Sequence, residues 1–223
     1  MGRDAGTAVT LGNNSPHSLV LTTDYRVPDP TRVWPLLQRR QQGLAALGAH
    51  HVFVYTSTTD AERVLVTIAL DTREPVADLL RSQAFFQWFD AVGVEDFPAV
   101  FAGELVELLE FVDESDWAAP GVVVVGITAV EDLAGFRVHV RQTRDVFKTA
   151  GIRRARIFEA FDDPHEVMFL QELVDEASAR RWLARPDIAA EWLSDAGVGA
   201  YPPVFVGRLA HTMRIGETNE GQH

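Results

Sequence analysis

The chain has 223 residues, of which 47% are hydrophobic, and it carries a formal net charge of −12 with Lys148 as its single lysine. A chain this acidic is repelled by nucleic-acid phosphates and by anionic lipid surfaces, so both are excluded as partners. The absence of cysteine excludes disulfides, thiolate nucleophiles and sulfur-ligated metals. No apolar run approaches the roughly 20 residues that span a bilayer, and the sequence predicts a globular cytoplasmic protein.

The first half of the chain contains six predicted elements. Runs of β-branched and aromatic residues indicate strands, and apolar residues at helical spacing indicate helices. In chain order they are a strand at 19–25, a helix at 28–48, a hairpin of strands at 50–57 and 63–70, a helical region at 73–92 broken near Ser82, and a long strand at 99–111.

The second half contains the same series. Its elements are a strand at 121–128, a helix at 132–151, a hairpin of strands at 153–160 and 166–174, a helical region at 176–196 and a strand at 203–215. Six elements in the order βαββαβ are typical of an α+β ferredoxin-like sandwich, in which both helices cover one face of an antiparallel sheet.

The two halves are copies of one unit. GVEDFPAVFAGEL at 93–105 returns as GVGAYPPVFVGRL at 197–209, a step of 104 residues. Upstream the step becomes 103, so that Leu44 matches Phe147, and the one-residue difference falls in the hairpin turns, where insertions are tolerated. The chain is therefore divided into an N-terminal arm (1–17), a first ferredoxin-like repeat (18–112), a linker (113–120), a second repeat (121–215) and a C-terminal tail (216–223).

Each predicted sheet leaves one half-apolar face bare, and the other copy can cover it. The element order, the repeat and a helix pattern shared by 82–88 and 186–192 make the chain resemble the dimeric α+β barrel superfamily in its fused form. The resemblance implies a pseudo-dimeric barrel within one chain. It implies kinship with antibiotic-biosynthesis monooxygenases, stress-responsive barrel proteins, muconolactone-isomerase-like proteins and haem-handling enzymes, and it assigns no activity by itself.

Strand alternation sorts the hairpin residues into two faces when the turns are placed near 60–61 and 163–164. The face predicted to pack under the helices holds Val52, Val54, Val66, Ile68, Ala155, Ile157, Met168 and Leu170. The face predicted to line the space between the sheets holds His51, Phe53, Tyr55, Leu65, Thr67, Arg154, Arg156, Phe158, Phe169 and Gln171. This second set mixes aromatic and hydrogen-bonding side chains, as small-molecule pockets do.

Two functions remain open for this lining. In the first, the barrel binds a small apolar or aromatic molecule and acts as a cofactor-independent monooxygenase or isomerase. His51 and Tyr55 would polarise or deprotonate the ligand, and Arg154 or Arg156 would hold an anionic oxygen. In the second, the lining residues satisfy one another, the barrel is filled, and the chain is a non-catalytic stress-response or interaction protein, either monomeric or homo-oligomeric.

Glu104 and Arg208 occupy equivalent positions in the two closing strands. They are predicted to form a cross-repeat ion pair, or Glu104 is a general base, which requires burial to raise the pKa of its carboxyl. An inward-facing Arg156 needs an anionic partner, because an unpaired buried guanidinium is costly. Glu104 is the predicted partner.

The histidines show no metal-ligand spacing. His50 and His51 are adjacent and are therefore predicted to face opposite sides of a strand. His139 could take the place of the axial histidine that haem-handling barrels carry on a helix, or it is a hydrogen-bonded boundary residue. Trp88 and Trp192 either flank a substrate or dock their helices on the sheet. We predict neither a bound metal nor a cofactor.

Overall fold

A computed structural model of the chain describes residues 19–94, 97–111, 121–184 and 204–215. The first half consists of β1 (Leu19–Arg26), the short 3-10 helix η1 (Pro30–Arg32), α1 (Val33–Arg39), α2 (Gln41–Ala46), β2 (Ala49–Ser57), β3 (Arg63–Leu70), α3 (Glu74–Leu80), α4 (Gln83–Val92) and β4 (Ala99–Glu110). The second consists of β5 (Val122–Ala129), α5 (Leu133–Gln142), α6 (Arg144–Ala150), β6 (Ile152–Ala160), β7 (Glu166–Leu173), α7 (Glu176–Leu183) and β8 (Phe205–Arg214).

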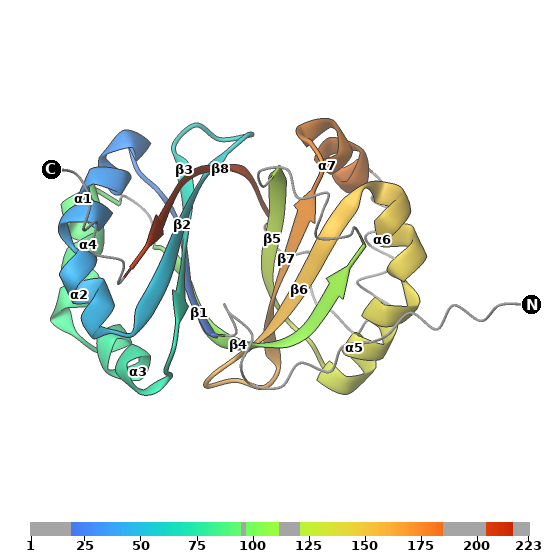
Figure 1. Ribbon diagram of the computed structural model, residues 1–223, viewed down its shortest axis with the longest axis horizontal. Coiled ribbons are helices and arrows are strands. Elements are labelled where there is room, and N and C mark those ends of the chain that lie inside the picture. Colours follow the sequence, from blue (N-terminus) through green and yellow to red (C-terminus); the bar gives the residue numbers. More distant parts are fainter. Residues whose placement is uncertain (1–18, 95–96, 112–120, 185–203, 216–223) are drawn as a thin grey trace, which may run out of the picture.

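The described strands close into an eight-stranded antiparallel barrel in the order β1-β3-β2-β8-β5-β7-β6-β4, with β4 returning to β1 (Figure 1). Each half supplies a four-stranded sheet, and the halves join where β8 pairs with β2 and β4 pairs with β6. The last strand of each half therefore pairs with its own sheet on one side and with the sheet of the other half on the other side. The predicted α+β architecture, two ferredoxin-like repeats forming one barrel within the chain, is confirmed.

The helices lie outside the barrel, with α1 to α4 over one sheet and α5 to α7 over the other (Figure 1). The predicted break at Ser82 is present, because the Ser82 hydroxyl accepts a hydrogen bond from the Phe85 amide at 3.3 Å and so caps α4. The predicted helix at 28–48 is divided into η1, α1 and α2, with Arg40 between the two α-helices. Most of the region 176–196, including Trp192, lies outside the described residues.

Side-chain packing explains the phenylalanine and glycine that recur in the repeated sequences at 93–105 and 197–209. A Cβ atom added to Gly103 would lie 2.7 Å from the Phe101 ring, and one added to Gly207 would lie 2.4 Å from the Phe205 ring. Residues two apart share a strand face, so each phenylalanine folds over the glycine that follows it inside the barrel. The same phenylalanine and glycine are needed in both copies because the two closing strands enter the barrel in the same way.

The middle of the barrel is packed with apolar side chains. One cluster holds Val20, Tyr55, Leu65, Phe101, Val123, Val125, Phe158, Ala160, Met168, Leu170 and Phe205. Two further clusters lie between the sheets and their helices. The centre of the barrel is thus filled by its own side chains, and the open space among the described residues lies toward its ends and under the helices.

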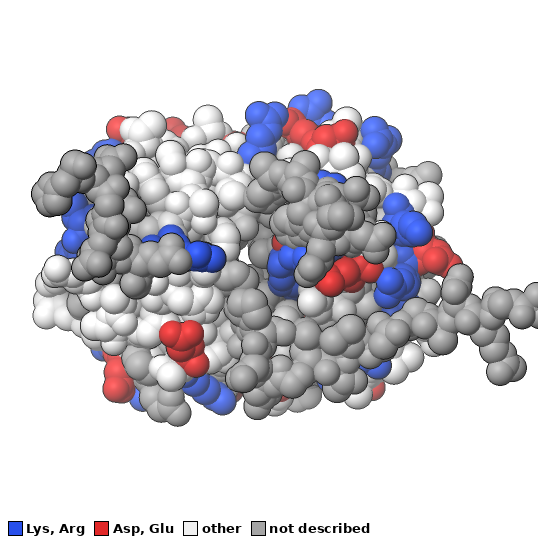
Figure 2. Space-filling view, viewed as in Figure 1, with Lys and Arg blue, Asp and Glu red and all other residues white. Residues whose placement is uncertain are grey.

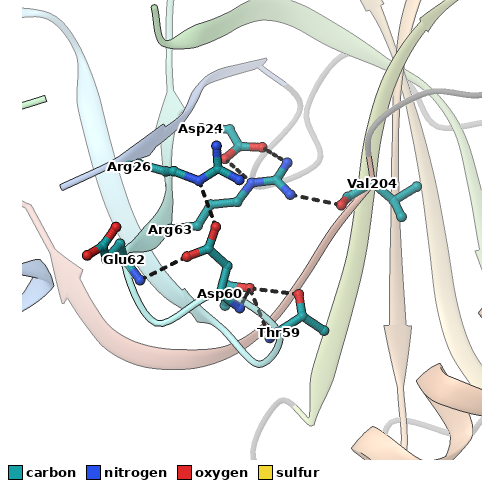
Figure 3. Close-up of polar contacts among 8 residues, drawn as sticks. Asp24, Arg26, Thr59, Asp60, Glu62, Arg63 and Val204 are labelled. Carbon is teal, nitrogen blue, oxygen red and sulfur yellow. Dashed lines mark hydrogen bonds and ion pairs between the residues drawn. The ribbon is translucent and has the colours of Figure 1, made fainter. Parts of the chain in front are cut away.

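A polar network at one end of the barrel ties the halves together (Figure 3). The Arg63 guanidinium donates two hydrogen bonds to the Asp24 carboxylate, at 2.9 and 2.6 Å, and a third to the Val204 carbonyl of the second half at 3.1 Å. Arg26 pairs with Asp60 beside it at 2.7 Å. Two parallel hydrogen bonds to a carboxylate fix the plane of a guanidinium. The third hydrogen bond of Arg63, to the Val204 carbonyl, can therefore orient the chain that leads into β8.

The face assignment of β7 was wrong by one residue. Phe158 pairs with Met168, and Ile157 pairs with Phe169, so the register is displaced by one position from a turn centred between residues 163 and 164. A one-residue shift turns every side chain of a strand to the other face. Met168 and Leu170 therefore face the barrel interior, whereas Phe169 and Gln171 face the helices.

On the surface shown in Figure 2, acidic and basic side chains lie next to one another. A further set of ion pairs joins α5 to β4. The buried Glu107 carboxylate accepts hydrogen bonds from Arg141, at 2.8 and 2.6 Å, and from Arg137 at 3.1 Å. Burial by itself raises the pKa of Glu107, but the hydrogen bonds and charges of the two arginines outweigh it and hold that pKa below its usual value.

Replacing Glu107 by glutamine is expected to lower the free energy of unfolding by roughly 2 kcal/mol at neutral pH, because two charge-assisted contacts are weakened. A depressed folded pKa means that the contribution is complete above the unfolded value of about 4.3 and is lost as the pH falls through the lower folded value. Urea denaturation of both proteins across the acid range should therefore show the difference narrowing below about pH 4. A difference that stays constant with pH would contradict this assignment.

Candidate functional site

A cavity of about 210 Å³ lies inside the barrel, where β2 and β6 begin and β3 and β7 end. We call it the lumen cavity. It is lined by Val20, Phe53, Tyr55, Thr67, Ala69, Arg154, Arg156, Phe158, Leu170 and Glu172. The structure thus brings six of the sequence-predicted site residues to one place, three from each half of the chain: Phe53, Tyr55, Thr67, Arg154, Arg156 and Phe158.

Two arginines project into this cavity with different partners. Arg156 forms an ion pair with Glu172, and both side chains are largely buried. Arg154 pairs with Glu110 at 2.6 Å, and 42% of the Glu110 side chain is exposed. The predicted partner of Arg156, Glu104, was wrong, because Glu104 lies exposed on β4 while Glu172 shares the inward face with Arg156.

Tyr55 can act in the cavity only as a protonated group. Burial raises the pKa of its phenol far above the usual value, the nearby Glu172 carboxylate raises it further, and Arg156 only partly opposes them. A phenol of this kind donates a hydrogen bond at neutral pH and does not accept a proton from a ligand. The predicted use of Tyr55 as a base is therefore disfavoured on physical grounds, and its use as a donor is retained as a proposal.

His51 lies on β2 two residues before Phe53, outside the lining of the lumen cavity, and its ring stacks on the Phe53 ring at 5.9 Å. Its Nδ1 lies 2.8 Å from Nδ1 of His50, and its Nε2 accepts from Arg214 Nε at 3.2 Å. The prediction that the two histidines face opposite sides was wrong, because the strand register shifts between Ala49 and His51. The catalytic role of His51 remains a prediction.

Three other predicted residues do not line the lumen cavity. The Gln171 amide oxygen accepts a hydrogen bond from the Trp182 indole at 3.0 Å on the helix side of the sheet. Arg208 is exposed and pairs with Glu176 of α7, so the predicted pair with Glu104 was wrong. The physical reason is that β4 and β8 lie on opposite sides of the barrel and that both side chains are exposed on its outer surface.

A second cavity, of about 280 Å³, lies between the first-half sheet and its helices. We call it the helix–sheet pocket. It is lined by Leu21, Thr23, Leu37, Arg40, Gly43, Leu44, Leu47, Val66, Ile68, Leu79, Phe85 and Trp88. The lining is almost entirely apolar, with the Thr23 hydroxyl, the Arg40 guanidinium and the Trp88 indole as its polar side-chain groups. Trp88 packs against this side of the sheet and also lines the pocket, so its position is compatible with both predicted roles.

The equivalent space in the second half is occupied by large side chains. The step of 103 residues continues past the hairpins, because Val54 pairs with Val66 as Ile157 pairs with Phe169, so the prediction that the one-residue difference falls in the hairpin turns was wrong. Leu44, Val66 and Leu79 of the pocket therefore correspond to Phe147, Phe169 and Trp182. These three aromatic residues are buried in one cluster, and the Phe147 and Trp182 rings meet edge to face at 5.7 Å. Sequence comparison matched Leu44 with Phe147 but missed the other two pairs, because it placed the change of step in the hairpin turns and not beyond them.

The helix–sheet pocket does not suit a haem. The helix–sheet pocket is lined by no histidine, cysteine, methionine or tyrosine, the side chains that ligate haem iron. His139 lies on α5, outside the barrel, and Phe147 of α6 and Trp182 of α7 are buried in the cluster between these helices and their sheet. Within the described ranges, no group of three histidine, cysteine, aspartate or glutamate side chains is arranged to hold a metal ion.

Among the described helices, none has the length and apolar character to cross a membrane.

The sequence matches no family model, and no curated protein is detectably related to it. Solved structures share its fold. An anthrone oxidase-like protein superposes with a TM-score of 0.65 at 12% identity, covering 93% of this chain and 97% of its own. A heme-binding protein from Thermus thermophilus superposes with a TM-score of 0.50 at 15% identity, covering 87% and 94%. The chain therefore has the dimeric α+β barrel fold that these structures share, with both halves of the barrel on one polypeptide.

Proposed function

We propose that this protein binds a small, largely apolar aromatic molecule in the helix–sheet pocket of its first half. One observation carries the proposal: the first half keeps aliphatic side chains at three positions where the second half has filled the same space with Phe147, Phe169 and Trp182. Unfilled space in a protein interior lowers the stability of the fold. The first half keeps a cavity that the second half has filled, and a bound ligand accounts for this difference.

The size and lining of the pocket support a ligand of two or three fused rings. Its volume of about 280 Å³ lies at the small end of known ligand sites. Apolar walls favour an aromatic body, and the Thr23 hydroxyl and Arg40 guanidinium can orient a single carbonyl or phenol oxygen. Heme itself, the ligand named for one protein of the same fold, is not supported by this lining.

Binding can be measured with the neutral dye prodan, which has two fused rings and one carbonyl and fluoresces strongly in apolar surroundings. We expect one site per chain. Transferring the second-half residues by the double substitution Leu44→Phe, Leu79→Trp should weaken dye binding by at least about tenfold, or about 1.4 kcal/mol, because the cavity is filled.

Two controls accompany this experiment. Leu36→Phe adds the same ring on α1, outside the lining of the pocket, and should leave dye binding unchanged. Thermal denaturation of the double variant should show a melting temperature no lower than that of the original chain, since filling a cavity does not remove contacts. Undiminished dye binding by a folded double variant would refute the proposed site.

We propose as the enzymatic form of this function the cofactor-independent oxygenation of an electron-rich aromatic ketone. The support is the apolar lining of the pocket and the guanidinium of Arg40, which can stabilise the enolate that reacts with dioxygen. Anthrone is a suitable probe, because one anthrone and one dioxygen give one anthraquinone and one water. With the original chain, oxygen uptake should exceed the spontaneous rate, and with the double variant it should return to that rate. If the original chain also gives only the spontaneous rate, the proposed oxygenation is refuted and only the binding function stands.

A further inference from the structure

The lining of the lumen cavity carries an excess of one positive charge. Two guanidinium groups, those of Arg154 and Arg156, line it together with one carboxylate, that of Glu172. Glu110, the partner of Arg154, is not part of the lining and is partly exposed at the end of β4. A carboxylate that enters the cavity can therefore share the Arg154 guanidinium with Glu110, whose ion pair lies partly in solvent.

The two guanidinium groups are held close together and away from water. Arg154 and Arg156 alternate along β6 and so share its inward face, with only 15% and 17% of their side chains exposed. Burial, and next the charge of Arg156, lower the pKa of the Arg154 guanidinium. A negatively charged group placed between them would offset both the desolvation and the repulsion.

The remaining lining suits an aromatic carboxylate. Tyr55 keeps its proton and can donate a hydrogen bond, while Phe53, Phe158 and Leu170 form apolar walls. Charge-assisted hydrogen bonds from guanidinium to carboxylate are among the stronger polar contacts in proteins. We propose that the lumen cavity is a binding site for a small organic monocarboxylate built on a single aromatic ring, with its carboxylate held by Arg154 and Arg156 and its ring against Phe53 and Phe158.

This site is separate from the helix–sheet pocket, because the two cavities lie on opposite faces of the same sheet. Thr67 and Ala69 of β3 face the lumen cavity, whereas Val66 and Ile68 of the same strand face the pocket. The proposal does not depend on the function proposed above, and one set of variants distinguishes them.

Titration calorimetry with benzoate and with benzamide, its neutral counterpart, tests the proposal on the full chain. Benzoate should bind at one site per chain and benzamide at least about tenfold more weakly, since a charge-assisted contact is worth about 1.5–3 kcal/mol. Arg154→Gln should weaken benzoate binding by at least about tenfold, and its exposed partner Glu110 allows the variant to fold. Tyr55→Phe, which keeps the ring, should weaken it by a smaller factor.

Two comparison variants complete the test. Arg208→Gln removes an arginine outside the barrel and should leave benzoate binding unchanged. The Leu44→Phe, Leu79→Trp protein should lose prodan binding and keep benzoate binding. The proposal is overturned if benzoate does not bind, if benzamide binds equally well, if Arg154→Gln binds benzoate as before, or if the double variant loses it.

Discussion

Replacing Trp182 by alanine is expected to lower the free energy of unfolding by about 3–5 kcal/mol, the usual cost of deleting a large buried aromatic side chain. Trp182 is 7% exposed, its ring meets Phe147 edge to face at 5.7 Å, and its indole donates to Gln171 at 3.0 Å. The substitution removes all of these contacts and leaves the Gln171 amide oxygen buried without its donor. Chemical denaturation with urea measures the change.

The matched substitution in the first half is Leu79→Ala. Leu79 is only partly buried and borders the helix–sheet pocket, so its removal should cost roughly 1–2 kcal/mol. Trp182→Leu, which copies the first-half residue, should open space in the second half and raise the number of prodan sites from one toward two. Equal losses from Trp182→Ala and Leu79→Ala would mean that the two halves are packed alike, against the asymmetry described above.

Arg156→Ala is expected to destabilise the protein by about 3 kcal/mol, because it leaves the Glu172 carboxylate buried without its cation. The side chains of Arg156 and Glu172 are 17% and 12% exposed, so little solvent is available to replace the lost partner. The effect is the cost of an uncompensated charge and does not measure the net value of the ion pair. Thermal and urea denaturation at neutral pH provide the measurement.

The double substitution Arg156→Met, Glu172→Leu removes both charges and keeps apolar volume, so it should recover most of the lost stability. Arg208→Ala removes an arginine that is 64% exposed and should change the free energy of unfolding by less than about 1 kcal/mol. An Arg156→Ala protein as stable as the original would place this guanidinium in solvent, and the lumen cavity would then lose its charged lining.

The fold could be predicted from the sequence because its determinants are local and repeated. The element order follows from strand and helix periodicity, and the step of 103 to 104 residues requires two equivalent units, each with a sheet face to cover. Alternation along β2 and β6 also placed Phe53, Tyr55, Arg156 and Phe158 on the inner face, since neither strand is interrupted between those residues.

The sequence did not determine how the inner residues pair with one another. The faces of Phe169 and Gln171 depend on the register of β7 against β6, which a single residue of turn length reverses. The partner of Arg156 depends on strand register. The β6–β7 hairpin sets Glu172 opposite Arg154 on the inner face, whereas β4 sets the exposed Glu104 opposite Glu159.

By itself, then, the sequence determined the two repeats, their ferredoxin-like order and the need of each sheet to be covered by the other copy. Only the tertiary structure decided which positions of the two copies are equivalent beyond the hairpins, and that one pocket stays open under the first-half helices. It also decided that Arg154 and Arg156 share a cavity with Tyr55. Cavities and ion pairs depend on distances between side chains far apart in the chain, and these are set by strand register and barrel closure, which local periodicity does not encode.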